Sequence, residues 1–301
     1  MLPAQAEGGM SVTEGVFPPI TTPMDESGAV DYDALRAHIK RLEAAGVHGI
    51  IPCGSTGERA TLTREEHKHV IETSVDATST PVLAGTGASS TREAIELSQH
   101  AADVGADGVL VIYPYYSWPS NDHVVHHYEA IADAVDVPLV IYNIPKRTAR
   151  NLEPDATVRL AEHPNIRGIK ESAGDINQIY ELLQRTRDME FDVLSGYDSQ
   201  ALSTITLGGT GITSVAANVF PETVCDLYEA AQTGNLERGR ELHEEVLEFE
   251  AAMNLQTIPV AVKAALDILG VHESHVRPPL YEADPETREQ LESFLADRNP
   301  A

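Results

Sequence analysis

Short apolar runs alternate with amphipathic segments through residues 15 to 219. Each run of four to seven residues leads through a turn into ten to fifteen residues whose apolar positions have helical spacing. In "DYDALRAHIKRLEAAG", for example, Leu35, Ile39 and Leu42 fall on one stripe. The apolar runs are "GVFPPIT", "GIIPC", "PVLAG", "GVLVIYP", "LVIYNIP", "IRGIK", "FDVLSG" and "GITSVAA".

These runs are apolar throughout rather than alternating, which indicates strands buried on both faces, as in a parallel sheet covered by helices. Eight βα units in a row predict a closed (β/α)₈ TIM barrel of the α/β class. The alternative is a doubly wound open sheet, which usually carries a glycine-rich phosphate turn after its first strand. Here the first run leads into "TTPMDESG", and the nearest such turn, Gly85-Thr86-Gly87, lacks the third glycine. The pattern favours the barrel.

After Pro221 the strand pattern stops and the remaining segments all have helical spacing. We therefore expect the last barrel helix to be followed by a small helical appendix packed on the barrel. The predicted organisation is a flexible N-terminal segment (residues 1–14), a barrel catalytic domain (15–233) and a C-terminal helical region (234–301).

Composition and charge narrow the classes of function. No stretch approaches the ~18 to 20 uncharged apolar residues of a membrane span, and "MLPAQAEGGM" lacks the features of a signal peptide, so we expect a cytoplasmic protein. Cys53 and Cys225 are too few for a disulfide framework. The formal charge of −26 argues against binding nucleic acid or anionic membranes. Acidity this strong is typical of a protein adapted to a salt-rich, halophilic cytosol.

In a TIM barrel the active site lies at the carboxyl ends of the strands. No histidine or cysteine cluster falls at these ends, so we expect no metal site. The chemically useful residues there are Thr21, Thr22, Gly54 to Glu58, Tyr115, Tyr116, Tyr142, Asn143, Arg147, Lys170, Glu171, Ser195 to Asp198, Thr213 and Ser214.

Lys170 is the outstanding catalytic candidate. The chain has five lysines, Lys40, Lys68, Lys146, Lys170 and Lys263. The apolar run "IRGI" would deliver Lys170 into the barrel mouth, where burial disfavours the ammonium and lowers the pKa. A neutral lysine amine can attack a ketone and form a Schiff base that acts as an electron sink. The alternative is an ordinary strand-end lysine with its ammonium in water, and the position favours the catalytic interpretation.

Hydroxyl groups around Lys170 could supply the proton transfers that Schiff-base formation needs. Tyr142 lies on the neighbouring strand, and Ser55, Thr56, Tyr115 and Tyr116 could relay its proton to solvent.

The "GSTGE" loop has a second possible use. Gly54 and Gly57 let the backbone turn tightly, so that the amides and hydroxyls of Ser55 and Thr56 could face the carboxylate of an α-keto acid. Arg147 would be available for a second carboxylate, although taken alone it could equally be a surface arginine.

Four motifs together resemble the dihydrodipicolinate synthase/N-acetylneuraminate lyase family of pyruvate-dependent class I aldolases. They are "GSTGE", "YYSWP", "YNIPKRT" and "GIKESAGD", spaced one per strand in the family's order. The resemblance runs from about Gly15 to the end of the chain. It implies a (β/α)₈ barrel that needs no cofactor, because pyruvate itself forms the Schiff base, and a homotetramer built from tight dimers.

The resemblance also implies roles for individual residues. Lys170 would form the Schiff base with pyruvate, and Tyr142 would transfer protons through Ser55 and a tyrosine lent by a neighbouring subunit, here Tyr116. The hydroxyls of Ser55 and Thr56 would hold the pyruvate carboxylate. The positions Arg147, Gly196 and Thr213 would also contribute to substrate binding.

The resemblance leaves more than one aldehyde partner of pyruvate open. Arg147 and "GERATLTREEH" are similar to the synthase branch, in which the arginine binds the carboxylate of aspartate semialdehyde. Trp118, "SGYD" and "IPVAVKAAL" depart from that branch. The alternatives are an aldolase that cleaves 2-keto-3-deoxygluconate or its 6-phosphate to pyruvate and a glyceraldehyde or its phosphate, and a barrel that binds a keto acid without catalysis.

Overall fold

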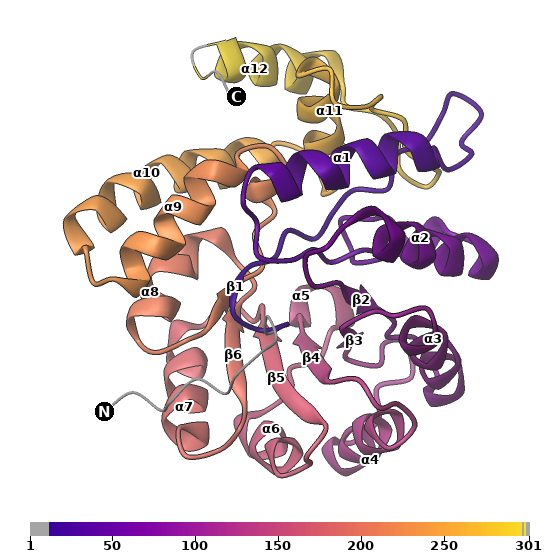
Figure 1. Ribbon diagram of the computed structural model, residues 1–301, viewed down its shortest axis with the longest axis vertical. Helices are drawn as coiled ribbons and strands as arrows, with labels where there is room; N and C mark the ends of the chain where they lie inside the picture. Colours follow the sequence, from indigo (N-terminus) through magenta and orange to yellow (C-terminus); the bar gives the residue numbers. More distant parts are fainter. Residues whose placement is uncertain (1–11, 297, 299–301) are drawn as a thin grey trace.

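The computed structural model describes residues 12–296 and 298. Seven parallel strands form one curled sheet in the order β1-β7-β6-β5-β4-β3-β2, and helices surround it (Figure 1). The strands are β1 (Gly15–Val16), β2 (Leu83–Gly85), β3 (Gly108–Ile112), β4 (Leu139–Asn143), β5 (Ile166–Glu171), β6 (Asp192–Ser195) and β7 (Gly211–Ile212).

The predicted second strand, "GIIPC", closes the ring without forming a regular strand. Ile51 makes a parallel bridge to Pro19, and Ile50 makes one to Val82. The Leu83 N–H donates to the Ile50 carbonyl at 3.0 Å. Prolines cannot donate to a ladder, and Pro52 follows directly, so the pairing here stays short. Eight segments thus complete the predicted (β/α)₈ barrel, which the structure confirms.

Helices follow the strands as the sequence pattern indicates, and Leu35, Ile39 and Leu42 are fully buried as predicted. The helices of the barrel are α1 (Tyr32–Ala44), α2 (Arg64–Ala77), α3 (Thr91–Asp103), α4 (Asn121–Ala132), α5 (Pro145–Thr148), α6 (Pro154–Ala161), α7 (Ile176–Thr186), α8 (Ala201–Thr206) and α9 (Pro221–Gln232). Three 3₁₀ turns, η1 (Arg59–Thr61), η2 (Asp198–Gln200) and η3 (Ala216–Asn218), lie in the loops.

Alternate residues of each strand face two different cores. Ile141 and Ile169 pack in the layer between strands and helices, whereas Val140, Tyr142 and Leu194 belong to the cluster inside the barrel. Because side chains alternate along a strand, Lys170 points inward after Ile169. The period of the strand therefore sets the direction of the lysine.

The C-terminal region consists of α10 (Leu236–Met253), α11 (Val260–Ile268) and α12 (Pro285–Ala296). In Figure 1, α10 lies beside α9 of the barrel, and α11 and α12 lie at the top of the molecule. The core of this region includes Phe249, which stacks on Phe220 of the barrel with ring centroids 3.7 Å apart. The expected boundary at 233/234 falls between α9 and α10.

Three expectations concern the ends and the composition of the chain. Residues 1–11 of the N-terminal segment expected to be flexible lie outside the described residues, and Val12 and Thr13 are buried. Both cysteines are free. Within residues 12–296 and 298, no helix is long and apolar enough to span a membrane, and no group of histidine, cysteine or acidic side chains is arranged to hold a metal ion.

Gly85 should tolerate no side chain, because a Cβ there would overlap the carbonyl of Cys53 and lie 3.0 Å from the carbonyl of Pro52. These are backbone atoms of the bridged segment that closes the barrel. We expect Gly85→Ala to lower the free energy of unfolding by about 1–3 kcal/mol, measured by urea denaturation. In Gly54→Ala, a matched control in the same region, the nearest atom is 3.6 Å away. That variant should stay within about 0.5 kcal/mol of the parent. Equal losses in the two variants would contradict the steric argument.

Candidate active site

Lys170 and Tyr142 meet inside the barrel because their strands pair in register. Lys170 on β5 lies opposite Tyr142 on β4, and its Nζ lies 4.3 Å from the centroid of the Tyr142 ring. Lys170 is 5% exposed and Tyr142 is 6% exposed. Two residues that the sequence placed on adjacent strands thus form one buried pair.

The surroundings of Lys170 weaken its ammonium form. Burial lowers the pKa of Lys170 to about 7, an effect that the negative charge of Asp198 opposes and the positive charge of Arg147 reinforces. A substantial fraction of the amine is therefore neutral near pH 7, which is the form that can act as a nucleophile.

Tyr142 keeps its proton at neutral pH. Burial raises its pKa to about 12, while the positive charge of Arg147 and the nearby Ser55 side chain lower it. A neutral phenol can donate one proton and accept another, and Ser55 offers the next hydroxyl toward the opening.

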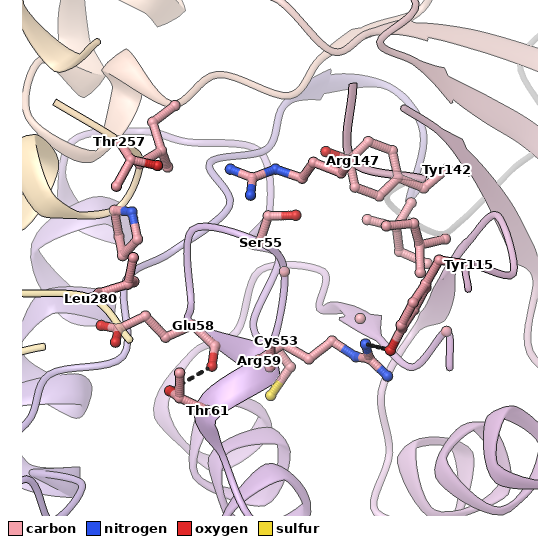
Figure 2. Close-up of a pocket in the computed structure, with 18 of the residues that line it drawn as sticks. Cys53, Ser55, Glu58, Arg59, Thr61, Tyr115, Tyr142, Arg147, Thr257 and Leu280 are labelled. Carbon is pink, nitrogen blue, oxygen red and sulfur yellow. Dashed lines mark hydrogen bonds between the residues drawn. The ribbon is translucent and has the colours of Figure 1, made fainter. Parts of the chain in front are cut away.

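Two adjoining cavities meet at these residues. A larger one of about 320 Å³ lies toward Tyr115, and a smaller one of about 70 Å³ contains Lys170. Ser55, Tyr142 and Arg147 line both. Figure 2 shows the guanidinium of Arg147 extending from the Tyr142 side over Ser55 toward Thr257. Arg147 therefore faces the site, whereas the sequence alone did not distinguish a site arginine from a surface arginine at this position.

The "GSTGE" loop turns beside Lys170 in the way its glycines suggest. A Cβ on Gly57 would lie 3.1 Å from the Ile20 carbonyl, and the Thr22 hydroxyl donates to the Gly57 carbonyl at 2.8 Å. Ser55 and the buried Thr56 both line the smaller cavity. The backbone packing of Gly57 thus brings two adjacent hydroxyl residues to the amine.

Gly196 and Thr213 occupy different places in the site. Gly196 lines the smaller cavity, where a Cβ would overlap the Ser172 hydroxyl. Thr213 is buried and its hydroxyl donates to the Ser195 carbonyl at 2.9 Å. It is not among the described residues that line the two cavities. Thr213 thus stabilises the carboxyl end of β6 through this hydrogen bond and does not line the cavities.

The two tyrosines that follow β3 lie in different environments, Tyr115 at the larger cavity and Tyr116 in solvent. The Tyr115 hydroxyl accepts a hydrogen bond from Arg59 at 3.0 Å and lines the larger cavity (Figure 2). Tyr116 is 90% exposed, has φ 78°, and is not among the residues lining either cavity. A positive φ is unfavourable for a tyrosine, so this loop holds Tyr116 away from its own site at a conformational cost.

Asn143 and Glu171, also at strand ends, face the outer side of the sheet. The Glu171 carboxylate accepts hydrogen bonds from the Asn143 amide at 3.0 Å and the Ala173 N–H at 2.6 Å. Burial raises the pKa of Glu171, and these donors oppose the shift. The pair fixes the ends of β4 and β5, and with them the positions of Tyr142 and Lys170.

The sequence reasoning gave no role to two contributions to the site: Asp198, which it placed at a strand end, and the C-terminal region. Asp198 is buried in the smaller cavity, where burial and the charge of Glu250 raise its pKa to about 7. The C-terminal region lines the cavities as well, through Glu250, Met253, Asn254, Thr257, Ile258, Pro259, Pro279 and Leu280. Asp198 lies at the end of β6, so its position in "SGYD" was an available signal. The contact with the C-terminal region had none.

Comparison with known proteins extends this description. A model of the dihydrodipicolinate synthetase family matches residues 12–298. The chain belongs to this family. The family resemblance drawn from the four motifs is thereby confirmed.

Relatives of the chain are similar along their whole length. The 4-hydroxy-tetrahydrodipicolinate synthase of Natronomonas pharaonis is 49% identical over 94% of this chain and 97% of its own. The crystal structure of the dihydrodipicolinate synthase from Aquifex aeolicus matches with a TM-score of 0.92 and 40% identity, over 95% and 98% of the chains. The chloride-inhibited enzyme from Acinetobacter baumannii complexed with pyruvate gives a TM-score of 0.93 and 35% identity, over 97% and 100%.

Lys170→Met should stabilise the fold at neutral pH, because methionine carries no ammonium to desolvate. The pKa of Lys170 falls from 10.5 to about 7 on folding, so between these values the unfolded chain binds the extra proton. We expect a gain of about 2–4 kcal/mol at pH 7 that shrinks as the pH rises toward 10.5. Urea denaturation at fixed protein concentration measures it. Lys146→Met, at an exposed position, is the control, and an equal and pH-independent gain in both variants would contradict the desolvation argument.

Proposed function

We propose that this protein is a 4-hydroxy-tetrahydrodipicolinate synthase, which binds pyruvate as a Schiff base on Lys170 and joins it to aspartate semialdehyde. The observation that carries the proposal is the buried Lys170 amine beside Tyr142. The synthase relatives, among them one that is 49% identical, support the choice of reaction.

The first chemical step follows from the state of the Lys170 amine. The neutral amine attacks the ketone carbon of pyruvate, and the carbonyl oxygen leaves as water after two proton transfers. Loss of a proton from the pyruvate methyl group then gives an enamine, whose carbon attacks the aldehyde. The amino group of the semialdehyde then displaces the Lys170 amine from the imine carbon, which closes the ring and frees the lysine. Every step moves protons and electron pairs between the substrates and the protein, so the proposed reaction needs no cofactor.

Tyr142 is the proposed proton carrier of these steps. Ser55 lines both cavities with it and lowers its pKa, and the resulting pKa of about 12 keeps it protonated until a reacting oxygen or nitrogen takes the proton. Ser55 then passes a proton between Tyr142 and the larger cavity, which both residues line.

The two carboxylates of the substrates have separate partners in the proposal. Ser55 and Thr56 lie beside Lys170 and would hold the carboxylate of pyruvate. Arg147 lines both cavities and would bind the carboxylate of the semialdehyde.

The third relay hydroxyl is proposed to come from a second copy of the chain. Tyr116 is exposed in its own chain and is held outward by a positive φ. The larger cavity lies beyond Ser55 and has about 320 Å³ of space, so a tyrosine from a partner could complete the relay there. We propose a homotetramer built from dimers that exchange this residue. A monomeric variant of one dihydrodipicolinate synthase has been characterised, so the assembly is a separate question from the fold.

The working environment is proposed to be a salt-rich cytoplasm. A formal charge of −26 creates strong self-repulsion that salt screens. Activity should therefore be measured at high and low potassium chloride.

The proposal is tested by assaying purified protein with pyruvate and aspartate semialdehyde, and in parallel with 2-keto-3-deoxygluconate and its 6-phosphate. We expect condensation with the semialdehyde, and borohydride reduction in the presence of pyruvate should add one pyruvate-derived group at Lys170. Lys170→Ala should lose turnover by at least about 10³-fold, and Arg147→Ala should raise KM for the semialdehyde about 10-fold or more.

The outcomes separate the alternatives. Lys146 is an exposed lysine beside Arg147. The variant Lys146→Ala is the matched control and should keep full activity. Cleavage of the sugar acid without condensation would move the protein to the aldolase alternative while keeping the chemistry of Lys170. Absence of any adduct in the parent protein would leave only the alternative of a barrel that binds a keto acid without catalysis.

Exchange of Tyr116 between subunits can be tested by complementation. Tyr116→Phe and Lys170→Ala should each be nearly inactive when expressed alone. In mixed dimers, the site that retains Lys170 receives Tyr116 from its partner, so equal co-expression should restore about a quarter of the parent activity. Size-exclusion chromatography reports the assembly. An unrestored mixture that still forms mixed oligomers would refute the exchange.

A further inference from the structure

Lys263 is the second lysine of this chain that is withdrawn from water. It lies on α11 in the C-terminal region and is 0% exposed. Its Nζ lies 2.5 Å from Oε1 of Glu58, whose side chain is also fully buried. The ammonium donates to the His275 carbonyl at 2.7 Å as well. Burial lowers the pKa of Lys263, and the adjacent Glu58 charge opposes that shift.

Glu58 is the last residue of the "GSTGE" loop, and its backbone is held in an unusual conformation. Its φ is 54°, in the left-handed region that non-glycine residues seldom adopt. Its N–H donates to the Ser55 carbonyl at 3.3 Å, and its carbonyl accepts from the Thr61 hydroxyl at 3.0 Å (Figure 2). The position of Glu58 is thus linked to the position of Ser55, three residues earlier.

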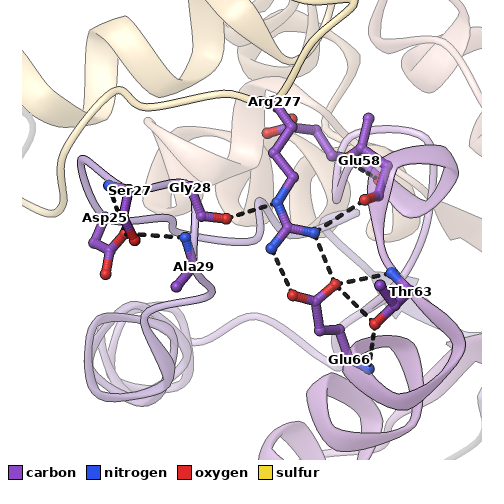
Figure 3. Close-up of polar contacts among 9 residues, drawn as sticks. Asp25, Ser27, Gly28, Ala29, Glu58, Thr63, Glu66 and Arg277 are labelled. Carbon is purple, nitrogen blue, oxygen red and sulfur yellow. Dashed lines mark hydrogen bonds and ion pairs between the residues drawn. The ribbon is translucent and has the colours of Figure 1, made fainter.

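Arg277 of the C-terminal region attaches to the same loop from outside. Its backbone N–H donates to Oε2 of Glu58 at 3.1 Å. Its guanidinium binds both carboxylate oxygens of Glu66, at 2.7 and 2.6 Å, and the carbonyl of Gly28 at 2.7 Å (Figure 3). Glu66 in turn accepts from the Thr63 N–H in the capping box of α2. The Glu58 carboxylate is therefore held from both sides by the C-terminal region.

These contacts lead to an assignment that rests on the proposed function. We propose that Lys263 and Glu58 are positioning residues, whose buried ion pair fixes the "GSTGE" loop so that Ser55 and Thr56 meet the pyruvate carboxylate beside Lys170. The C-terminal region thereby takes part in substrate binding without contacting pyruvate through either residue.

The strength of the link follows from burial. No water surrounds this ion pair, so loss of the cation leaves a buried carboxylate that keeps only the Arg277 N–H on Oε2 among its described partners, which favours movement of the side chain toward solvent. That movement acts on a backbone that is already in a strained conformation. The hydroxyls of Ser55 and Thr56 would shift with it, and misplacement of a binding group by even an ångström weakens binding markedly.

The test is the pyruvate concentration that gives half-maximal borohydride trapping at Lys170, measured on the full chain. In Lys263→Met we expect this concentration to rise about tenfold or more, while the adduct at saturating pyruvate still reaches the parent level. In the double variant Lys263→Met, Glu58→Gln, no buried charge is left unpaired. Its half-saturation should return to within about threefold of the parent.

The matched control is Arg288→Met, which removes another ion pair of the C-terminal region, that between Arg288 and Asp267 at 2.7 Å. It should lower the thermal midpoint and leave the half-saturation unchanged. A purely structural role of Lys263 would have that same signature. Unchanged half-saturation in a folded Lys263→Met variant would therefore overturn the assignment.

If Lys263→Met does not fold, the half-saturation of the single variant Glu58→Gln tests the assignment by itself. The amide keeps the shape of the side chain but removes the charge that pairs with the Lys263 ammonium, so one buried charge is left unpaired, as it is in Lys263→Met. A rise in half-saturation supports the assignment, and a parent-like value overturns it. Failure of the proposed function itself is recognised separately, because the parent protein would then give no adduct at any pyruvate concentration.

Discussion

Removal of the Lys170 amine from water is the constraint on which the site depends. An ammonium in the barrel interior loses its hydration, and the residues that the structure describes offer it no fully charged partner in return. Asp198 is the nearest compensating acid, but its own burial raises its pKa to about 7, so its charge is incomplete at neutral pH. Lys263 shows the opposite solution, since it lies against Glu58 at 2.5 Å. One buried lysine is thus held as a cation and the other is left free to lose its proton.

The remaining architecture keeps that desolvation in place. Val140, Leu194 and Leu110 fill the barrel below the amine, and Thr257, Ile258 and Leu280 from the C-terminal region cover part of the larger cavity above Ser55. On the outer face of the strands, the Asn143–Glu171 hydrogen bonds prevent β4 and β5 from sliding. A slip of either strand by one residue would turn its own residue, Tyr142 on β4 or Lys170 on β5, out of the barrel.

Much of this arrangement could be predicted from the sequence because it follows from local periodicity. The uniformly apolar runs indicated eight parallel segments, and the carboxyl ends of those segments brought Lys170, Tyr142 and Ser55 together. The irregular pairing at Ile50–Ile51 was not predictable from hydrophobicity, since it results from the prolines around it. The lining by Thr257 and Ile258, and the Lys263–Glu58 pair, depend on how distant helices pack over the barrel. Such contacts leave no periodic signal in the chain. The exposure of Tyr116 was consistent with the resemblance, but its positive φ required coordinates.

The use of lysine and arginine in this acidic chain can be understood from the chemistry of the two cations. Arg277 binds both oxygens of Glu66 with its planar guanidinium, and Arg41 donates to the carbonyls of Asn218 and Val219. Neither role requires a proton to leave. A guanidinium stays protonated in proteins and could not serve as the nucleophile, so the position of Lys170 is restricted to lysine. At Lys263 the slender ammonium fits between one carboxylate oxygen and one carbonyl, where a five-donor fork would leave donors unpaired. Of the five lysines, the two that are buried are therefore those whose positions an arginine could not fill.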